Sequence, residues 1–380
     1  MKTSNWQYFL HRYYKTCQKF CLLPILWDNT GQTVKFETSK IRIFLWCLMQ
    51  SYYTADTVYL AVTICTINYA ELTPEETMKL LSHGLSRMGA CILIAWFAND
   101  FKSANNLINQ VCKVHQRLKD EYYTDQNGGV DDGLFYVTFG VITVHIQPIG
   151  PTLQHLEERH SVRYWGNRLL PGDFYDNKIG IALFAFAELL LSYMAIFGTG
   201  YAATQLVVYA QITRNWLQLI CNNSQPKDAT SSRNMSRNVS LYKILHVLNC
   251  FHRETCSALL WPITQHVLCA VHVLVNVITI KCWHILPAPI RFTLFLSAFA
   301  FSYFESSCFK AAAEIYESSA RFKQNMACMP RRIAYYKRVE MSLWCIRINV
   351  SSAYHFEMDT FNSCMQAVVD NTVNVLLTFF

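Results

Sequence analysis

Four polar side chains recur at every fourth position near the carboxyl end of the chain: Gln366, Asp370, Asn374 and Thr378. In an α-helix this spacing places them on one face, with a drift of about 40° per step. The residues between them are mostly Val and Leu, and the segment 358–380 is long enough to cross a bilayer as a helix. A carboxylate on such a helix is tolerated only beside water or other protein, which predicts one wall of an aqueous pathway.

The same stripe could instead form a buried helix–helix contact, in which Asn and Gln side chains hydrogen-bond across the interface. Asp370 could likewise form a salt bridge with a cation of another helix, or carry a proton in an apolar site. The spacing alone does not separate these interpretations. The elements around the stripe must be considered first.

The whole chain is apolar: 52% of its 380 residues are hydrophobic and 16% are charged, against about 25% charged residues in ordinary soluble domains. We therefore predict an all-α membrane protein. Seven membrane-spanning helices are expected, at 41–67, 78–98, 133–150, 179–203, 258–283, 291–309 and 358–380. The fifteen cysteines include no CxxC pair and no His/Cys ligand spacing, so neither a metal site nor a disulfide framework is predicted.

An odd number of spans puts the two termini on opposite sides of the membrane. The loops on the amino-terminal side hold 24 Lys and Arg, and the alternate loops hold 5. The positive-inside rule then predicts an intracellular amino terminus and an extracellular carboxyl terminus. The sequons at Asn222, Asn234 and Asn238 fall in a cytoplasmic loop and are expected to stay unglycosylated.

Several spans continue as amphipathic segments on the predicted cytoplasmic side, including Phe101–Leu118, Leu241–Phe251 and Ala311–Phe322. Their apolar stripes could lie on the membrane surface as basic helices or pack together as a cytoplasmic bundle. A further helix is expected from Arg331 to Trp344, and a polar break from Ser224 to Val239. The basic residues lie beside spans, so nucleic acid is not an expected partner.

This organisation divides the chain into four parts. We expect a cytoplasmic amino-terminal segment at 1–40, followed by the first six spans with their cytoplasmic extensions at 41–309. A cytoplasmic anchor segment at 310–357 then leads to the last helix at 358–380. No nucleophile–base pairing and no Gly-rich phosphate loop are visible, so neither an enzyme nor a cofactor is expected.

Three short motifs resemble those of insect gustatory receptors. The end of the chain, Thr372-Val-Asn-Val-Leu-Leu-Thr-Phe-Phe380, looks like the closing motif of that family, which reads Thr-Tyr, five hydrophobic residues, Gln-Phe. His355-Phe-Glu-Met-Asp359 resembles the start of the family's last helix, and Tyr14-Lys15 with Phe20-Cys-Leu-Leu-Pro24 resembles its amino-terminal motif. The chain departs from the family at Val373, where the family has Tyr, and at Phe379, where it has Gln.

The resemblance implies a tetrameric ligand-gated cation channel with a cytosolic anchor, in the plasma membrane of a sensory neuron. The subunits would form a homotetramer or a heterotetramer with related receptors, and the last helix of each would line the pore. In that arrangement Asp370 forms an acidic ring that concentrates permeant cations, and Leu376, Leu377, Phe379 or Phe380 would form a dry constriction. Gln366, Asn374 and Thr378 would supply oxygen atoms to partly hydrated ions. Because Phe379 replaces the Gln of the family motif, the resemblance does not define the chemistry of the gate.

A small-molecule tastant would bind in the outer half of the helix bundle. The candidate ligand-binding residues are His83, Arg87, His145, Gln147, Glu188, Tyr193, His272, Asn276, Phe299 and Tyr303. Each of them could instead make an interhelical contact. Arg87 and Glu188 could form a buried ion pair, and the helical spacing of Phe292, Phe295 and Phe299 favours packing.

Three other classes remain open on the sequence. An odorant receptor of the same superfamily has the same architecture. A G-protein-coupled receptor would need its amino terminus outside the cell and glycans on the 222–238 sequons. A transporter would show inverted repeats and discontinuous helices, and no internal repeat is visible.

Overall fold

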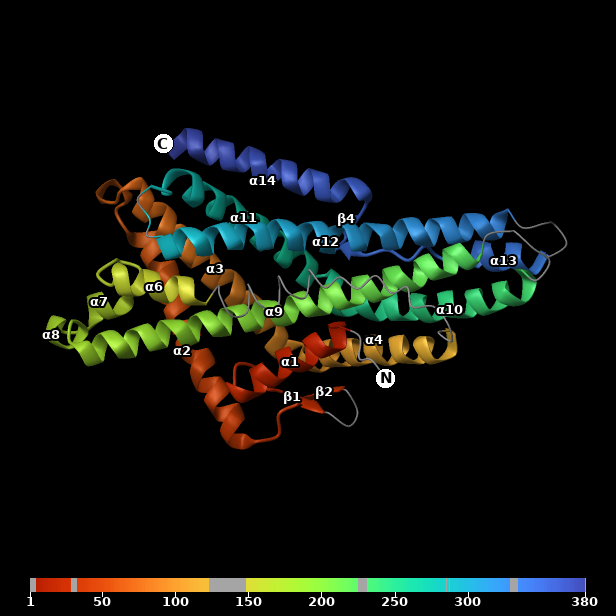
Figure 1. Ribbon diagram of the computed structural model, residues 1–380, viewed down its shortest axis with the longest axis horizontal. Helices are drawn as coiled ribbons and strands as arrows, with labels where there is room; N and C mark the ends of the chain where they lie inside the picture. Colours follow the sequence, from red (N-terminus) through yellow and green to blue (C-terminus); the bar gives the residue numbers. More distant parts are fainter. Residues whose placement is uncertain are drawn as a thin grey trace.

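The computed structural model describes residues 5–28, 33–122, 148–224, 231–284, 286, 288–328 and 334–379, and most of these are helical (Figure 1). Six of the predicted spans correspond to single helices: α2 (Lys40–Thr66), α3 (Pro74–Asn99), α9 (Lys178–Asn223), α11 (Leu260–Lys281), α12 (Ala288–Ala327) and α14 (Met358–Phe379). The predicted third span, 133–150, lies outside the described residues except for its last three positions. The prediction of an all-helical fold is confirmed.

Four helices in the described part of the chain are long and apolar enough to cross a membrane: α3, α9, α11 and the segment of α12 from Ile290. This indicates a membrane protein. Helices α2 and α14 are not among the four. Both carry polar residues along their length, which lowers their mean hydropathy; in α14 these include the stripe that contains Asp370.

Two of the membrane helices continue far beyond the length a bilayer requires. Helix α9 runs for 46 residues and α12 for 40, so each is about 60–70 Å long. Their extensions run beside α4 (Phe101–Tyr122) and α10 (Ser231–His252), as Figure 1 shows. The Tyr242 ring of α10 stacks on Phe322 of α12 at 4.9 Å. The amphipathic segments therefore pack together as a bundle.

The predicted break from Ser224 to Val239 is wrong over its second half, because α10 already begins at Ser231. The Ser, Asn and Arg residues of this segment suggested a turn. Met235, Val239 and Tyr242 are nevertheless buried at helical spacing, so packing against the bundle extends the helix. Helix α13 (Ala334–Ser342) lies within the segment predicted to be helical before α14.

The amino-terminal part contains structure that the sequence did not predict. Helix α1 (Asn5–Lys19) is followed by an antiparallel hairpin of β1 (Ile25–Asp28) and β2 (Thr33–Phe36). Tyr13 of α1 donates a hydrogen bond to the carbonyl oxygen of Phe197 on α9. The contact fastens α1 to the middle of the longest helix.

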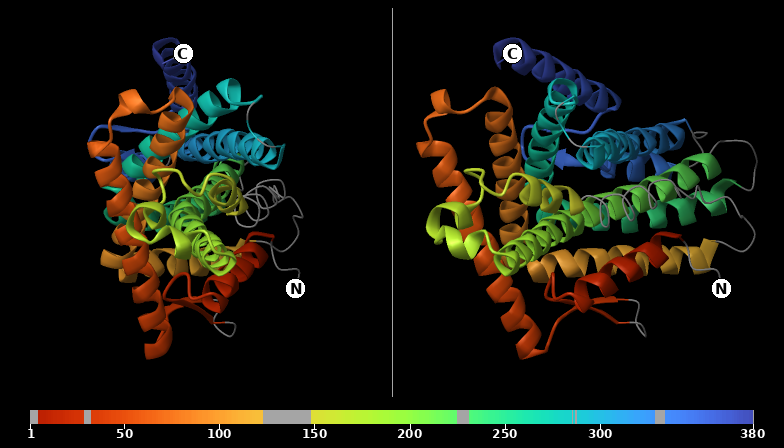
Figure 2. Two further views of the ribbon diagram at one scale, coloured as in Figure 1. Left: turned by 90° about the vertical axis from the view of Figure 1, so that its left-hand side faces the viewer. Right: turned by 60° about the vertical axis from the view of Figure 1, so that its left-hand side comes forward.

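Short elements cover the ends of the long helices. Near the start of α9 lie α6 (Ile149–Glu157), α7 (Trp165–Leu169) and α8 (Gly172–Tyr175), with the short helix η1 (Tyr69–Glu71) between α2 and α3. A π-helical turn, η3 (Arg253–Ser257), separates α10 from α11. A second hairpin, β3 (Asn349–Val350) and β4 (Tyr354–His355), precedes α14. Figure 2 shows α14 at one edge of the molecule and α1 with its hairpin at the opposite edge.

Candidate functional site

Helix α14 packs on the molecule through one face only. Cys364, Val368 and Thr372 are buried at four-residue spacing, and the helix contacts α11 and α12. The hairpin before it sets its position. Its turn residue Ser351 has a φ of 56°, and the Ser351 backbone N–H donates to the carbonyl oxygen of Ser257 in the π-helical turn at 2.8 Å. The start of α14 is therefore tied to the junction between α10 and α11.

The polar stripe lies on the other face and points away from its own subunit. Gln366, Asp370, Asn374 and Thr378 are all exposed. The Gln366 amide Nε2 donates to Asp370 Oδ1 at 2.8 Å, and the Thr378 hydroxyl donates to the Asn374 carbonyl at 2.7 Å. Of the residues that the structure describes, none forms an ion pair with Asp370. Burial of the stripe within one subunit is therefore not what the structure shows.

Leu377 is the most exposed of the large apolar side chains that the structure describes, at 79%. It lies on the same outward side of α14, one residue before Thr378. Apolar and polar groups thus alternate along a surface that this chain leaves uncovered. Such a surface requires either a second protein or water, because carboxylate and amide groups are costly against hydrocarbon.

Three of the candidate ligand-binding residues form one buried cluster between α3 and α9. Arg87 Nη2 donates to Glu188 Oε1, and His83 Nε2 lies 3.9 Å from the same carboxylate oxygen. Arg87 Nε is also 3.9 Å from Oδ2 of Asp56 on α2, and its guanidinium lies 5.4 Å from the centre of the Tyr53 ring. The ion pair that the sequence left as an alternative is present.

Aromatic side chains from the segment after the third predicted span cover this cluster. The Tyr164 ring lies 6.1 Å from His83 and 4.5 Å from His155 of α6. Burial, together with the neighbouring cations Arg163 and Arg159, lowers the pKa of His155 to about 4. His155 is therefore neutral at physiological pH and packs as an aromatic ring.

A second buried polar group joins α11 and α12. His272 Nδ1 lies 3.0 Å from Glu305 Oε2, and the Ser302 hydroxyl lies 3.3 Å from His272 Nε2. Glu305 was not among the predicted site residues, and neither was Asp56. Each is the only acidic residue in its predicted span, and a lone carboxylate in an apolar helix is a signal of function by itself.

The other candidates are scattered. Tyr193 packs against the rings of Phe20 and Phe197, with centroids 6.5 and 6.1 Å away, and Asn276 is half-buried on α11. His145 and Gln147 lie outside the described residues.

The spacing of Phe292, Phe295 and Phe299 favoured packing, and within this single chain all three side chains are exposed, with the Phe299 ring stacked on Tyr303 at 6.4 Å. Their helical spacing sets up an apolar face on α12, and the structure turns this face outward. An apolar surface on a membrane helix is equally compatible with lipid and with protein, because lipid tails are as apolar as Leu.

An apolar cavity of about 190 Å³ lies among α3, α9, α11 and α12. Small side chains of several helices meet there, including Ala90, Ala203 and Ala300. Of the predicted ligand-binding residues that the structure describes, only Tyr303 lines it. The Thr264 hydroxyl also faces this region and is buried without a hydrogen-bond partner in the described structure. No charged residue is among the described residues that line the cavity, so it suits an uncharged guest.

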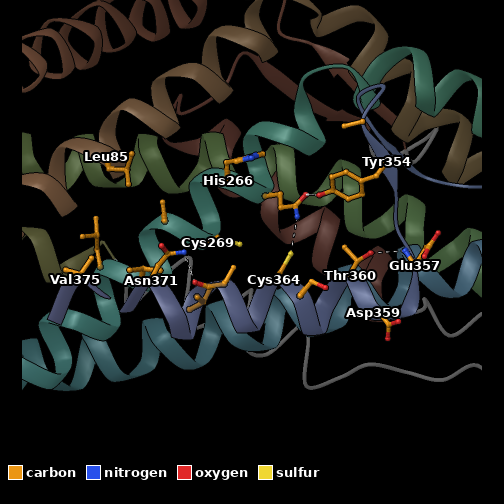
Figure 3. Close-up of a pocket in the computed structure, with 18 of the residues that line it drawn as sticks. Leu85, His266, Cys269, Tyr354, Glu357, Asp359, Thr360, Cys364, Asn371 and Val375 are labelled. Carbon is orange, nitrogen blue, oxygen red and sulfur yellow. Dashed lines mark hydrogen bonds between the residues drawn. The ribbon is translucent and has the colours of Figure 1, made fainter. Parts of the chain in front are cut away.

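A larger groove, of about 1110 Å³, runs between α11 and α14 (Figure 3). One end is apolar, with Leu85, Val273 and Val375. The other end carries a hydrogen-bond chain in which the Tyr354 hydroxyl donates to Gln265 Oε1 and Gln265 Nε2 donates to Cys364 Sγ at 3.0 Å. The sequence did not reveal this groove, since its walls come from segments about 90 residues apart.

The architecture is known from solved structures, although no protein-family model and no curated protein sequence matches the chain. The structure of the insect olfactory receptor OR5 from Machilis hrabei in complex with eugenol is similar to it, with a TM-score of 0.66 and 10% sequence identity over 97% of this chain and 99% of that one. The structure of the same receptor described without eugenol has a TM-score of 0.63 and 10% identity over 98% and 100% of the two chains.

The chain is thus a helical membrane protein with the fold of an insect olfactory receptor over nearly its whole length. At this sequence identity the likeness shows the fold. It confirms the mostly helical fold that the resemblance predicted.

Proposed function

We propose that this chain is a subunit of a chemoreceptor channel of the gustatory type, a ligand-gated cation channel opened by a small molecule. The observation that carries the proposal is the outward polar stripe of α14, Gln366 to Thr378, opposite a face that packs on α11. Four copies around an axis would convert the stripe into rings around a water-filled pore. The proposal adopts the predicted topology, with the amino terminus in the cytoplasm and the last helix ending outside.

Each residue of the stripe has a role in this channel. Asp370 forms the ring that attracts cations, and Gln366, Asn374 and Thr378 offer oxygen atoms to ions that keep part of their water. Leu377 is the apolar residue best placed to close the pore by excluding water. The Gln366–Asp370 hydrogen bond holds the carboxylate in one orientation along the helix.

We propose the cavity among α3, α9, α11 and α12 as the ligand site. Its volume of about 190 Å³ is below the roughly 300–1,000 Å³ of drug-sized pockets, so a small ligand is expected. The Thr264 hydroxyl and the Tyr303 side chain offer polar contacts on otherwise apolar walls. Ligand binding opens the pore if the open arrangement of these helices holds the ligand more tightly than the closed one.

The proposed ligand site lies deeper in the helix bundle than the residues that the sequence suggested. Arg87 and Glu188 were candidate ligand contacts in the outer half of the bundle, yet they neutralise each other. We assign them the structural task of holding α3 against α9, beside the cavity. Tyr303 remains a ligand contact in the proposal.

An odorant receptor is the second candidate, favoured by the apolar walls of the cavity. The receptor with the same fold was solved with eugenol, a small and largely apolar molecule. Sugars carry many hydroxyl groups, and the cavity offers few partners for them. A response to volatile compounds and none to sugars or bitter compounds would assign the chain to the odorant type.

The test is electrophysiology on the expressed protein against sugars, bitter compounds and volatiles. Asp370→Asn removes the charge of the proposed ring, and Asp370→Glu is the matched control that keeps it. We expect the cation-to-anion permeability ratio to fall in the first variant and to persist in the second. Unchanged selectivity of Asp370→Asn would remove Asp370 from the pore.

The cavity is tested separately by filling it. Ala203→Leu adds three carbons to the cavity wall and should abolish the response to the ligand, while the protein still reaches the cell surface. Thr264→Val keeps the shape but removes the hydroxyl, so it should weaken the response to hydroxylated ligands more than to hydrocarbons. A full response of Ala203→Leu would show that the ligand binds elsewhere.

A further inference from the structure

Cys269 of α11 and Cys364 of α14 lie on facing walls of the groove between these helices (Figure 3). We propose that they form a reversible oxidation site, a dithiol that peroxide converts into a disulfide joining the last helix to the bundle. Both are free thiols in the structure. Nothing in the pore or the ligand cavity requires either of them.

The two thiols lie on neighbouring walls of the same groove. Gln265 Nε2 donates to Cys364 Sγ at 3.0 Å. Gln265 lies one helical turn before Cys269 and is itself bonded to the Tyr354 hydroxyl. Cys364 is therefore held in one direction, toward α11, before any oxidation takes place.

A small oxidant can reach the pair. The groove has a volume of about 1110 Å³, and its lining beside the pair includes His266, Thr360 and Ser363. Cys364 is 8% exposed and Cys269 is half-buried. Cys17, Cys256 and Cys308 are less accessible still, at 0–1% exposed.

The reaction balances with peroxide as the oxidant. One thiol attacks the peroxide, the O–O bond breaks, and a sulfenic acid and one water form. The second thiol then attacks the sulfenic sulfur, the S–O bond breaks, and the hydroxyl leaves with the thiol proton as a second water. Two thiols have lost two electrons and two protons to one peroxide, and an added dithiol reverses the change by thiol–disulfide exchange.

The disulfide would restrict the last helix. A disulfide holds the two Cα atoms within about 4.4–6.8 Å of each other. It would fix α14 to α11 at its seventh residue, next to the polar stripe. On the proposed channel function, which this consequence assumes, opening requires α14 to move relative to α11. Oxidation should therefore suppress the ligand-evoked change in current.

The experiment treats cells that express the full chain with hydrogen peroxide, blocks remaining thiols with N-ethylmaleimide, and maps the digested protein by mass spectrometry. We expect a peptide pair linked between Cys269 and Cys364 within one chain, which disappears after dithiothreitol. In parallel recordings, peroxide should reduce the ligand-evoked current at least threefold, and dithiothreitol should restore it. Cys269→Ser and Cys364→Ser should keep the full current after peroxide.

Cys47→Ser is the matched control, because Cys47 is an exposed cysteine of α2 that does not line the groove. This variant should behave like the parent protein. Absence of the 269–364 link in the oxidised parent protein, or a link between two chains at these residues, overturns the proposal whatever the variants do. A link that leaves the current unchanged overturns the restriction of α14. A link in a protein that passes no current in the reduced state supports the oxidation site and counts against the channel function instead.

Discussion

The buried cluster contains one cation, Arg87, and two carboxylates. Removing the cation should therefore affect stability differently from removing one carboxylate. The Arg87 guanidinium contacts Glu188 and has Asp56 at 3.9 Å. The substitution Arg87→Gln leaves both carboxylates buried without a cation. The substitution Glu188→Gln leaves Arg87 beside Asp56, with an amide oxygen still able to accept its hydrogen bond. We expect the loss of the cation to be the more damaging change.

The magnitudes follow from the burial of all three groups. Removing one partner of a buried ion pair costs about 3–5 kcal/mol, and Arg87→Gln should reach that range. Replacing a charged hydrogen-bond partner by a neutral one costs about 1–3 kcal/mol, which applies to Glu188→Gln. Arg87→Lys should fall between them, because it keeps the charge but loses the planar contact with the Tyr53 ring.

The assay is thermal unfolding of the detergent-solubilised protein, followed by fluorescence-detected size exclusion. At roughly 1–2 °C per kcal/mol for a chain longer than 250 residues, Arg87→Gln should lower the melting temperature by about 3–10 °C. Arg159→Gln is the control, because it breaks a half-exposed pair with Asp176 and should cost under about 1 kcal/mol. A loss for Arg87→Gln no larger than this control, or smaller than that for Glu188→Gln, would refute the reasoning.

Three further outcomes are expected. An added Cβ at Gly180 would lie 2.1 Å from the carbonyl oxygen of Phe174, so Gly180→Ala should cost about 1–3 kcal/mol, seen as a lower melting temperature. His155 has a lowered pKa of about 4, against 6.5 in the unfolded chain. As the pH falls from 6.5 to 4, only the unfolded state gains a proton at this residue. The stability of the protein should therefore fall over that range, and it should fall less steeply in His155→Gln. The proposed topology places the sequons at Asn222, Asn234 and Asn238 in the cytoplasm, and Asn238 is also buried, with its Nδ2 donating to Ser224 Oγ at 3.0 Å, so glycosidase treatment should leave the mobility of the protein on a gel unchanged.

Each of these outcomes has a control. Gly200→Ala places its Cβ 3.1 Å from the Tyr13 hydroxyl, a less severe approach than 2.1 Å, and should be milder than Gly180→Ala. His160→Gln alters an exposed side chain of the same capping segment and should leave the pH dependence as it is. A glycan at Asn238 would contradict both the burial and the proposed topology.

The long helices could be predicted because their signal is local. Apolar runs and helical spacing predicted α3, α9, α11 and α12 as membrane helices, and the continued spacing after 203 and 309 predicted their extensions. The spacing also predicted that the polar residues of α14 share one face, but it did not decide between a water-facing wall and a buried contact; the structure shows that this face points outward. Its counterpart, the buried Cys364–Thr372 face, follows from the same geometry.

Features that depend on neighbours could not be predicted in this way. The exposed face of Phe292, Phe295 and Phe299 has the same composition as a packed one, and only the positions of the other helices distinguish them. The ligand cavity arises where small residues of several helices meet, and no single segment shows it. The hairpin at Ile25–Phe36 has strands of four residues, too short for an alternating pattern to stand out.

The outward carboxylate of α14 has a consequence for biosynthesis. A newly inserted subunit that has met no other copy would expose Asp370, with Gln366 and Asn374, to the hydrocarbon of the bilayer, at a cost of several kcal/mol. Such an unassembled subunit should be retained in the endoplasmic reticulum and degraded. On the proposed channel function, the stripe that lines the pore of an assembled receptor would also mark an unassembled subunit for the quality-control machinery of the cell.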